Sequence, residues 1–305
     1  MKNSLILISL NLLLTFVLTG SDIEPKKVKV VVVALFERGD VTADDPGEFQ
    51  LWVERYPLSE RIPFPHGNRD LYWNDQDGVL GMVTGIGTAK AAASITAVAL
   101  DPRFDFSQSY WLLAGIAGFD PADASLASVC WVDWVIDGVL SHTIDIREAP
   151  KGWSTGRFPF RAKSPYQQPR PANEGSYFKL NESLTNWAFA RTKEIQLMDT
   201  EAIAIRRRRF TETPMGQKPP FVLRGSYLAA MNFWHGAIEN EWANNWVEYW
   251  TDGKGEFVAS AMEGSGMMIA LKFLEQANLV DCSRVMMLRA ASNYTMQWPG
   301  GTAIE

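Results

Sequence analysis

Apolar runs alternate with amphipathic segments along the chain. Residues 28–36, VKVVVVALF, form a continuous β-branched run, which is typical of a strand buried on both faces. Similar strand patterns occur at 78–84, 110–118, 128–140, 219–228 and 284–295, helical patterns occur at 89–100, 181–195 and 239–250, and residues 255–274 read as a strand that breaks into a helix. This order predicts a three-layer α/β/α fold around a central mixed, largely parallel sheet.

Two segments differ from the regular strand and helix patterns, one by its composition and one by its tryptophans. Residues 148–178 are rich in Pro, Gly and basic residues and follow neither a helical nor a strand period, which predicts an insertion or lid within one domain spanning 28–305. Trp242, Trp246 and Trp250 fall at i, i+4 and i+8 of a helical pattern. We expect them to form a core stripe rather than a ligand platform.

The N-terminal residues have the pattern of an export signal. A lysine at position 2 precedes an apolar run, and small residues follow the run up to residue 20. Residues 21–27 form a charged linker. We expect the mature protein to be periplasmic or extracellular. An uncleaved membrane anchor is the alternative.

Composition narrows the range of partners. The 305 residues are 47% hydrophobic and 21% charged, with a net charge of −6, so the chain is globular and nucleic acid is not an expected partner. The run RRRR at 206–209 is more typical of a solvated face than of an anion site. Cys130 and Cys282 are expected to be buried free thiols. The three histidines are scattered, so we expect no metal site, and we expect no cofactor.

The segment TGIGTAK at 84–90 resembles a cofactor loop but does not match one. A dinucleotide fingerprint requires a third glycine at the sixth position, which is Lys90 here, and the phosphate-loop sequence is absent too. The remaining prediction is a tight turn at Gly85 and Gly87. Backbone N–H groups and the hydroxyls of Thr84 and Thr88 would then face a small anion or a water molecule.

Three further polar residues lie where predicted strands end. The Glu263 carboxylate suits a vicinal diol such as the ribose hydroxyls, although an acid at a helix start is equally expected. Asn293 can both accept from and donate to a purine edge, or it can simply occupy a turn. Glu37 could hold a water or a sugar hydroxyl, or it could be a surface acid.

Taken together, these blocks resemble one superfamily. VTGIGTAKAAAS, AGIAGFDPADAS, AMEGSG and RAASNYT occur in the order found in nucleoside phosphorylases and nucleosidases. The strings DPRFDFSQSYWLLAGIAG, IDIREAP, FWHG and LRAASNYT resemble the narrower group of purine nucleoside permeases. The resemblance runs from about residue 28 to the end and implies a nucleoside phosphorylase-like fold.

The resemblance also implies roles for individual residues. Glu263 with Met262 falls where the superfamily binds ribose hydroxyls, and Asn293 with Ser292 falls where it contacts the purine. The pocket for phosphate or attacking water corresponds to Thr84, Gly85 and Gly87. The catalytic carboxylate of nucleosidases corresponds to Glu37, with Asp40 as the alternative, and base-stacking aromatics are expected at Phe233 and Trp234.

The chain departs from the relatives' pattern at three places. Many relatives carry Asp where Asn293 stands, and Asn can hydrogen-bond a leaving purine but cannot protonate it. The narrower group more often has a carboxylate at the position of Gly264. Relatives close with a C-terminal helix, which we expect to be missing here.

The pattern of cations favours water as the nucleophile. A phosphorylase holds phosphate with cationic side chains, and no arginine lies between Gly85 and Pro102. We therefore expect an exported protein that binds a purine nucleoside (inosine, guanosine or adenosine) and hydrolyses its N-glycosidic bond. A non-catalytic binding component of nucleoside uptake is the alternative, and a phosphate-dependent phosphorylase is the third hypothesis. Phosphate, a second copy of the chain and a membrane transporter stay open as partners.

Overall fold

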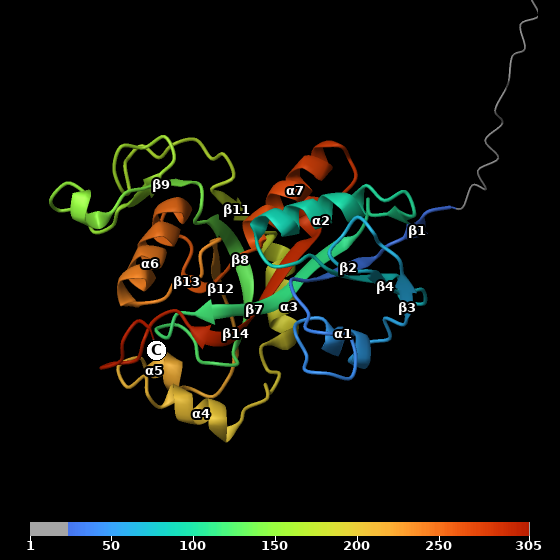
Figure 1. Ribbon diagram of the computed structural model, residues 1–305, viewed down its shortest axis with the longest axis horizontal. Coiled ribbons are helices and arrows are strands. Elements are labelled where there is room, and N and C mark those ends of the chain that lie inside the picture. The colour runs from blue at the N-terminus through green and yellow to red at the C-terminus, as the bar shows by residue number, and fades with distance from the viewer. Residues whose placement is uncertain (1–23, 305) are drawn as a thin grey trace, which may run out of the picture.

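Five strands of the protein close into a barrel. The computed structural model describes residues 24–304, so the predicted signal at 1–20 and part of the linker lie outside the described residues. The barrel strands are β7 (Tyr110–Phe119), β8 (Val129–Asp137), β12 (Val222–Ala229), β13 (Phe257–Ala261) and β14 (Val285–Tyr294). Closure comes from β14, which pairs parallel with β7 and antiparallel with β8 (Figure 1).

The prediction of a mixed α/β fold is confirmed, but the three-layer arrangement is wrong. The hydrophobic pattern identified the barrel strands without showing that β14 has two neighbours. Register shifts between Gly225 and Tyr227 of β12 and between Ala291 and Asn293 of β14 mark irregularities of the kind that bend strands. Bent, staggered strands close on themselves instead of forming an open layer.

A row of strands extends outward from the barrel. β2 (Val30–Ala34), β5 (Val79–Val83), β4 (Leu71–Asn74) and β3 (Glu60–Ile62) continue the sheet from β7, and β11 (Tyr177–Lys179) continues it from β8. β1 (Lys26–Lys27) pairs separately with β6 (Phe104–Asp105). β2, β5 and β7 run parallel, so their carboxyl ends meet at one edge.

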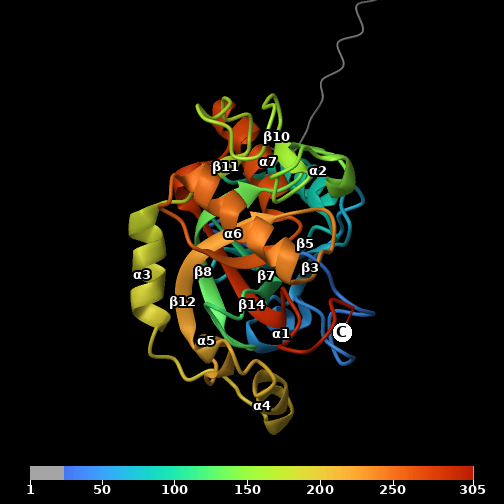
Figure 2. The same ribbon diagram turned by 90° about the vertical axis from the view of Figure 1, so that its left-hand side faces the viewer.

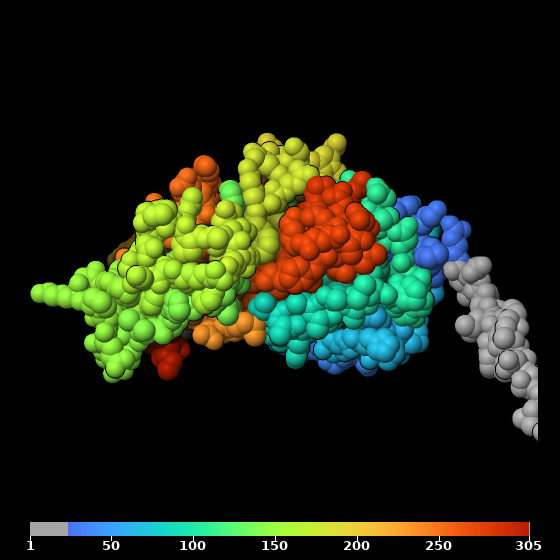
Figure 3. Space-filling model, turned by 90° about the horizontal axis from the view of Figure 1, so that it is seen from above, coloured from blue at the N-terminus to red at the C-terminus, as the bar shows by residue number. Residues whose placement is uncertain are grey.

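Helices cover this framework. Two helices, α2 (Thr88–Ala99) and α7 (Gly264–Gln276), lie side by side, as Figure 3 shows in teal and orange-red. The others are α1 (Gln50–Arg55), α3 (Glu182–Thr192), α4 (Glu201–Arg207), α5 (Pro214–Gln217) and α6 (Ala237–Thr251), with short 3₁₀ turns at Ile146–Glu148 and Cys282–Arg284 (Figure 2).

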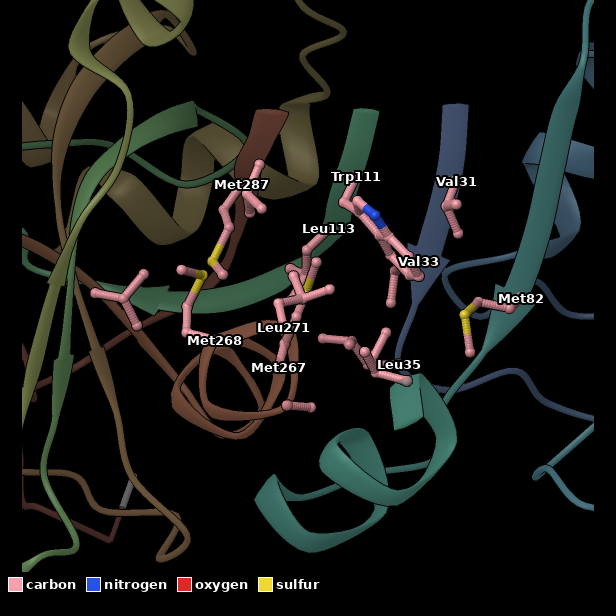
Figure 4. Close-up of a cluster of buried hydrophobic side chains, with 14 of the residues drawn as sticks. Val31, Val33, Leu35, Met82, Trp111, Leu113, Met267, Met268, Leu271 and Met287 are labelled. Atoms are coloured by element: carbon pink, nitrogen blue, oxygen red, sulfur yellow. The ribbon is translucent and has the colours of Figure 1, made fainter. Parts of the chain in front are cut away.

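The main core lies between the sheet and the paired helices. Met267 and Leu271 of α7 face Leu113 of β7 and Met287 of β14 in Figure 4, and all four side chains are fully buried. Cys130 and Cys282 are buried free thiols, as predicted. Across residues 24–304, no helix has the length and hydropathy that a membrane span requires.

The segment 148–178 packs against α6. Its strand β10 (Arg157–Pro159) pairs with β9 (Ser141–Thr143). The guanidinium of Arg170 donates to the carbonyl of Tyr249, and that of Arg157 lies 4.1 Å from the ring centre of Trp242. The three tryptophans of α6 are 3%, 0% and 2% exposed, which confirms the predicted core stripe.

Candidate functional site

A cavity of about 270 Å³ lies where strands of the barrel and β2 end. Its polar lining comes from Glu48, Asn232, Ser260, Glu263, Ser292, Asn293 and Thr295, and its larger apolar side chains are Leu35, Phe36, Ile86, Ile116, Met262, Phe233 and Trp234. Six of the predicted site residues, Met262, Glu263, Ser292, Asn293, Phe233 and Trp234, therefore line one cavity. A ligand site beyond the carboxyl ends of strands is the usual arrangement in α/β proteins.

The glycine loop of residues 84–88 supports Glu263 rather than facing the cavity. Gly87 N–H donates to Glu263 Oε1 over 3.0 Å, and the Thr88 hydroxyl donates to the carbonyl of Met262 over 2.7 Å. Of this loop, only Ile86 lines the cavity, whereas the buried Thr84 hydroxyl donates back to the carbonyl of Gly85.

Glycine is needed on both sides of this contact. Gly87 has a φ of +101°, a backbone conformation that other residues avoid. A Cβ on Gly266 would lie 2.2 Å from the carbonyl oxygen of Thr88, so α7 can approach α2 only without one. The N-termini of α2 and α7 consequently converge at Glu263, where their dipoles stabilise the carboxylate.

A buried arginine pairs with Glu263 and lies near a second carboxylate, Glu48. Arg289 of β14 is fully buried, and its Nη2 lies 3.6 Å from Glu263 Oε2 and donates to the Tyr227 hydroxyl over 2.9 Å. Its Nη1 donates to the carbonyl of Ile116 over 3.3 Å. A Cβ on Gly115 would lie 2.7 Å from Glu48 Oε1 and 3.0 Å from Arg289 Nη1, so these two groups flank the same glycine.

Glu48 is a second carboxylate in the lining of the cavity. The N–H groups of Ile116 and Leu35 donate to its two oxygens over 2.7 and 2.8 Å, which fixes the plane of the carboxylate. Burial raises the pKa of Glu48, although nearby Arg289 opposes the shift. A half-buried acid with a raised pKa at a cavity wall is a candidate general base.

The two acids selected from the sequence lie elsewhere. The Glu37 carboxylate accepts hydrogen bonds from the N–H groups of Arg38, Gly47, Phe49 and Gln50, and it does not line the cavity. Asp40 is exposed, and its N–H donates to Asp44. Glu37 thus folds the loop that carries Glu48, and the carboxylate of this loop that lines the cavity is Glu48 rather than Glu37 or Asp40.

The opposite end of the cavity carries amide and aromatic groups. Asn293 Oδ1 accepts from the Ser292 hydroxyl over 2.9 Å, and Nδ2 donates to the carbonyl of Tyr294 over 2.9 Å, which leaves one amide hydrogen free to bind a ligand. Phe233 is 77% exposed at the cavity mouth, whereas Trp234 is half-buried and packs edge-on against Trp242.

The family profile of purine nucleoside permease (NUP) matches residues 27–305. The chain belongs to the purine nucleoside permease family. The resemblance inferred from the sequence strings is therefore confirmed at the level of the family.

Two relatives named purine nucleoside permeases are 26–28% identical to this chain. A probable purine nucleoside permease of Schizosaccharomyces pombe is 28% identical over 73% of this chain, and the match spans 66% of that protein. A purine nucleoside permease of Candida albicans is 26% identical over 83% of this chain and 65% of its own length. The chain thus matches just under two thirds of the length of these relatives.

Solved structures support the fold. A mutant methylthioadenosine/S-adenosylhomocysteine nucleosidase of Helicobacter pylori, with 5′-methylthioadenosine in its active site, aligns with a TM-score of 0.51 and 15% identity over 88% of this chain and 87% of its own. Futalosine hydrolase of the same organism aligns with a TM-score of 0.50 and 14% identity over 88% and 86%. At this identity the two structures bear on the fold alone.

Proposed function

We propose that this family member binds purine nucleosides in the cavity and hydrolyses their N-glycosidic bond. The observation that carries the proposal is the cluster of Glu48, Arg289 and Glu263, which presents two carboxylates to one cavity around a buried guanidinium. Cleavage passes through a ribosyl cation-like state, which two carboxylates stabilise electrostatically.

The two carboxylates are suited to different tasks. Glu263 is held by the N–H of Gly87, so its remaining lone pairs can accept hydrogen bonds from the 2′- and 3′-hydroxyls of a ribose. Glu48, whose pKa is raised, can take a proton from water as that water attacks the anomeric carbon. The glycosidic electron pair then leaves with the purine.

The departing purine would lie beside Asn293 and below Phe233. The free amide hydrogen of Asn293 can hydrogen-bond ring nitrogen 7 or an oxygen at position 6 as negative charge develops there. An amide cannot transfer a proton, so the purine would have to take one from solvent. This feature favours slow turnover.

Water suits the nucleophile end better than phosphate. The described lining of the cavity includes no Lys or Arg, and the guanidinium of Arg289 is already bonded to Tyr227, Ile116 and Glu263. A phosphate dianion there would face Glu48 without a free cation.

A second candidate function is binding for uptake without cleavage. Curated relatives are named permeases, and Asn293 removes the general acid. The test is to incubate purified protein with inosine, with and without phosphate, and to follow free base by chromatography. We expect base release that does not depend on phosphate. Release only with phosphate would identify a phosphorylase, and intact inosine with a measurable affinity would identify a binding protein.

Replacing Glu263 by Gln is expected to weaken inosine binding by about tenfold or more, because a charged acceptor for the ribose hydroxyls is lost. Calorimetry should show that wild-type protein prefers inosine to 2′,3′-dideoxyinosine and that the variant does not. Glu239→Gln, on α6 and away from the cavity lining, is the matched control. A variant that keeps the wild-type preference would exclude the ribose role of Glu263.

A further inference from the structure

A second cavity adjoins the first at its purine end. Its volume is about 660 Å³, and Phe233, Ser292 and Asn293 line both cavities. Tyr294 and Phe210 form part of its wall, with ring centres 3.9 Å apart. A group attached to a base at Asn293 can therefore continue into the second cavity.

Two arginines of the RRRR run face this second cavity without an acidic partner. Arg207 pairs with Asp199 and Arg208 pairs with Glu201, whereas Arg206 and Arg209 line the cavity. Across residues 24–304, neither Arg206 nor Arg209 has a carboxylate within salt-bridge distance, and no Asp or Glu belongs to the cavity lining. The four consecutive arginines thus divide into two paired cations and two available ones.

The guanidinium group of Arg209 is held in position, and Arg206 lies beside it on the same turn of the chain. Arg206 is an exposed residue in the last turn of α4. The backbone N–H of Arg209 donates to the carbonyl of Arg206, and residues three apart on a helical turn project from the same side. The guanidinium of Arg209 stacks 3.4 Å from the ring centre of Trp298. Stacking restricts the side chain while its N–H donors stay free for planar oxyanions such as carboxylates.

We propose that the second cavity binds an anionic substituent on the purine, so that the protein accepts nucleosides with a carboxylate-bearing group at position 6 of the base. The inference rests on the proposed function, in which Asn293 hydrogen-bonds ring nitrogen 7 or the group at position 6. A substituent at that position points away from the ribose, past Asn293 and Ser292, toward Arg206 and Arg209. His235 adds a polar side chain to the same wall, and its Nδ1 is 2.8 Å from the carbonyl oxygen of Ala303.

The test uses four probes on the whole protein: adenosine, adenosine with a 1,2-dicarboxyethyl group on its 6-amino nitrogen, the dimethyl ester of that compound, and free succinate. Calorimetry should give a Kd for the diacid about tenfold lower than for the ester, since two exposed cations supply the difference. This gain should shrink as salt concentration rises. Succinate, alone or with adenosine, should not bind.

Variants separate this site from the nucleoside pocket. Arg206→Gln combined with Arg209→Gln should reduce the preference for the diacid to within about twofold and leave the adenosine Kd unchanged. Arg208→Gln, which removes an exposed arginine from outside the cavity lining, should change neither value, and thermal unfolding checks that all variants fold.

Each contrary result has a separate meaning. Equal affinity for diacid and ester, an unchanged preference in the double variant, or succinate binding as tight as diacid binding would overturn the anionic subsite while adenosine binding stands. Failure of adenosine, diacid and ester alike to bind would overturn the proposed function and this inference with it.

Discussion

Replacing Glu48 by Gln is expected to lower the rate of base release from inosine by at least about hundredfold, the usual contribution of a positioned general base. Gln keeps the shape of the side chain but cannot take a proton from water. Because the shape of the cavity is unchanged, the Kd for inosine should change little. The measurement is chromatography of free base under single-turnover conditions, beside calorimetry of inosine binding.

The pH dependence adds a second signature. Glu48 must be ionised to act as a base, and burial raises its pKa, so the wild-type rate should fall on acidification at a higher pH than an exposed Glu would give. This acid limb should disappear in the Gln variant. Glu212→Gln, an exposed residue outside the cavity lining, is the control and should keep the wild-type profile. Wild-type rates in Glu48→Gln would remove Glu48 from the mechanism.

The residues that could be identified from the sequence share one property. Glu263 lies just after β13 and Asn293 lies near the end of β14, and ligand sites in α/β proteins lie beyond strand ends, so both residues could be selected without a structure. Their proximity depends on the barrel, because β13 pairs antiparallel with β7 whereas β14 pairs parallel with it. Phe233 and Trp234 could be selected in the same way, because they follow the strand β12. The fold class followed similarly from the order of apolar runs.

Glu48 could not be found in this way because its position depends on a folded loop. The loop from Glu37 to Gln50 closes on the Glu37 carboxylate through backbone N–H groups, and only then does Glu48 reach the amides of Leu35 and Ile116. A sequence pattern does not distinguish the acid that folds a loop from the acid that the loop presents. The more prominent acid, directly after the strand, was the structural one.

The sequence does contain a signal for the buried position of Arg289. This arginine interrupts the apolar strand pattern VMMLRAA, and a buried arginine requires an acidic or hydrogen-bonding partner. That pattern predicts a partner without identifying it. The identity of the partners depends on barrel closure, which places β14 between β7 and β8 and aligns Arg289 with Gly115.

Replacing Arg289 by Met is expected to lower the free energy of unfolding by about 3–5 kcal/mol, because the loss leaves buried Glu263 and half-buried Glu48 without their cation. The wild-type cluster holds Glu48 and Glu263 around one guanidinium, and Tyr227 loses its charged donor as well. Urea unfolding measures the change. Arg284→Met, which removes a partly exposed partner of Asp281 beside the same strand, should cost less than about 1 kcal/mol.

The loss in Arg289→Met should depend on pH in a defined direction. Arg289 lowers the pKa of Glu48, so its removal raises the folded-state pKa of Glu48 further above the unfolded value. The cost of burying ionised Glu48 is then absent below the unfolded pKa and grows as pH rises through the folded pKa. The variant should therefore be closest to wild type at acid pH, and adding Glu48→Gln should recover part of its stability near neutral pH. A loss that is independent of pH and unaffected by Glu48→Gln would mean that Arg289 stabilises the barrel through packing and its bond to Tyr227 alone.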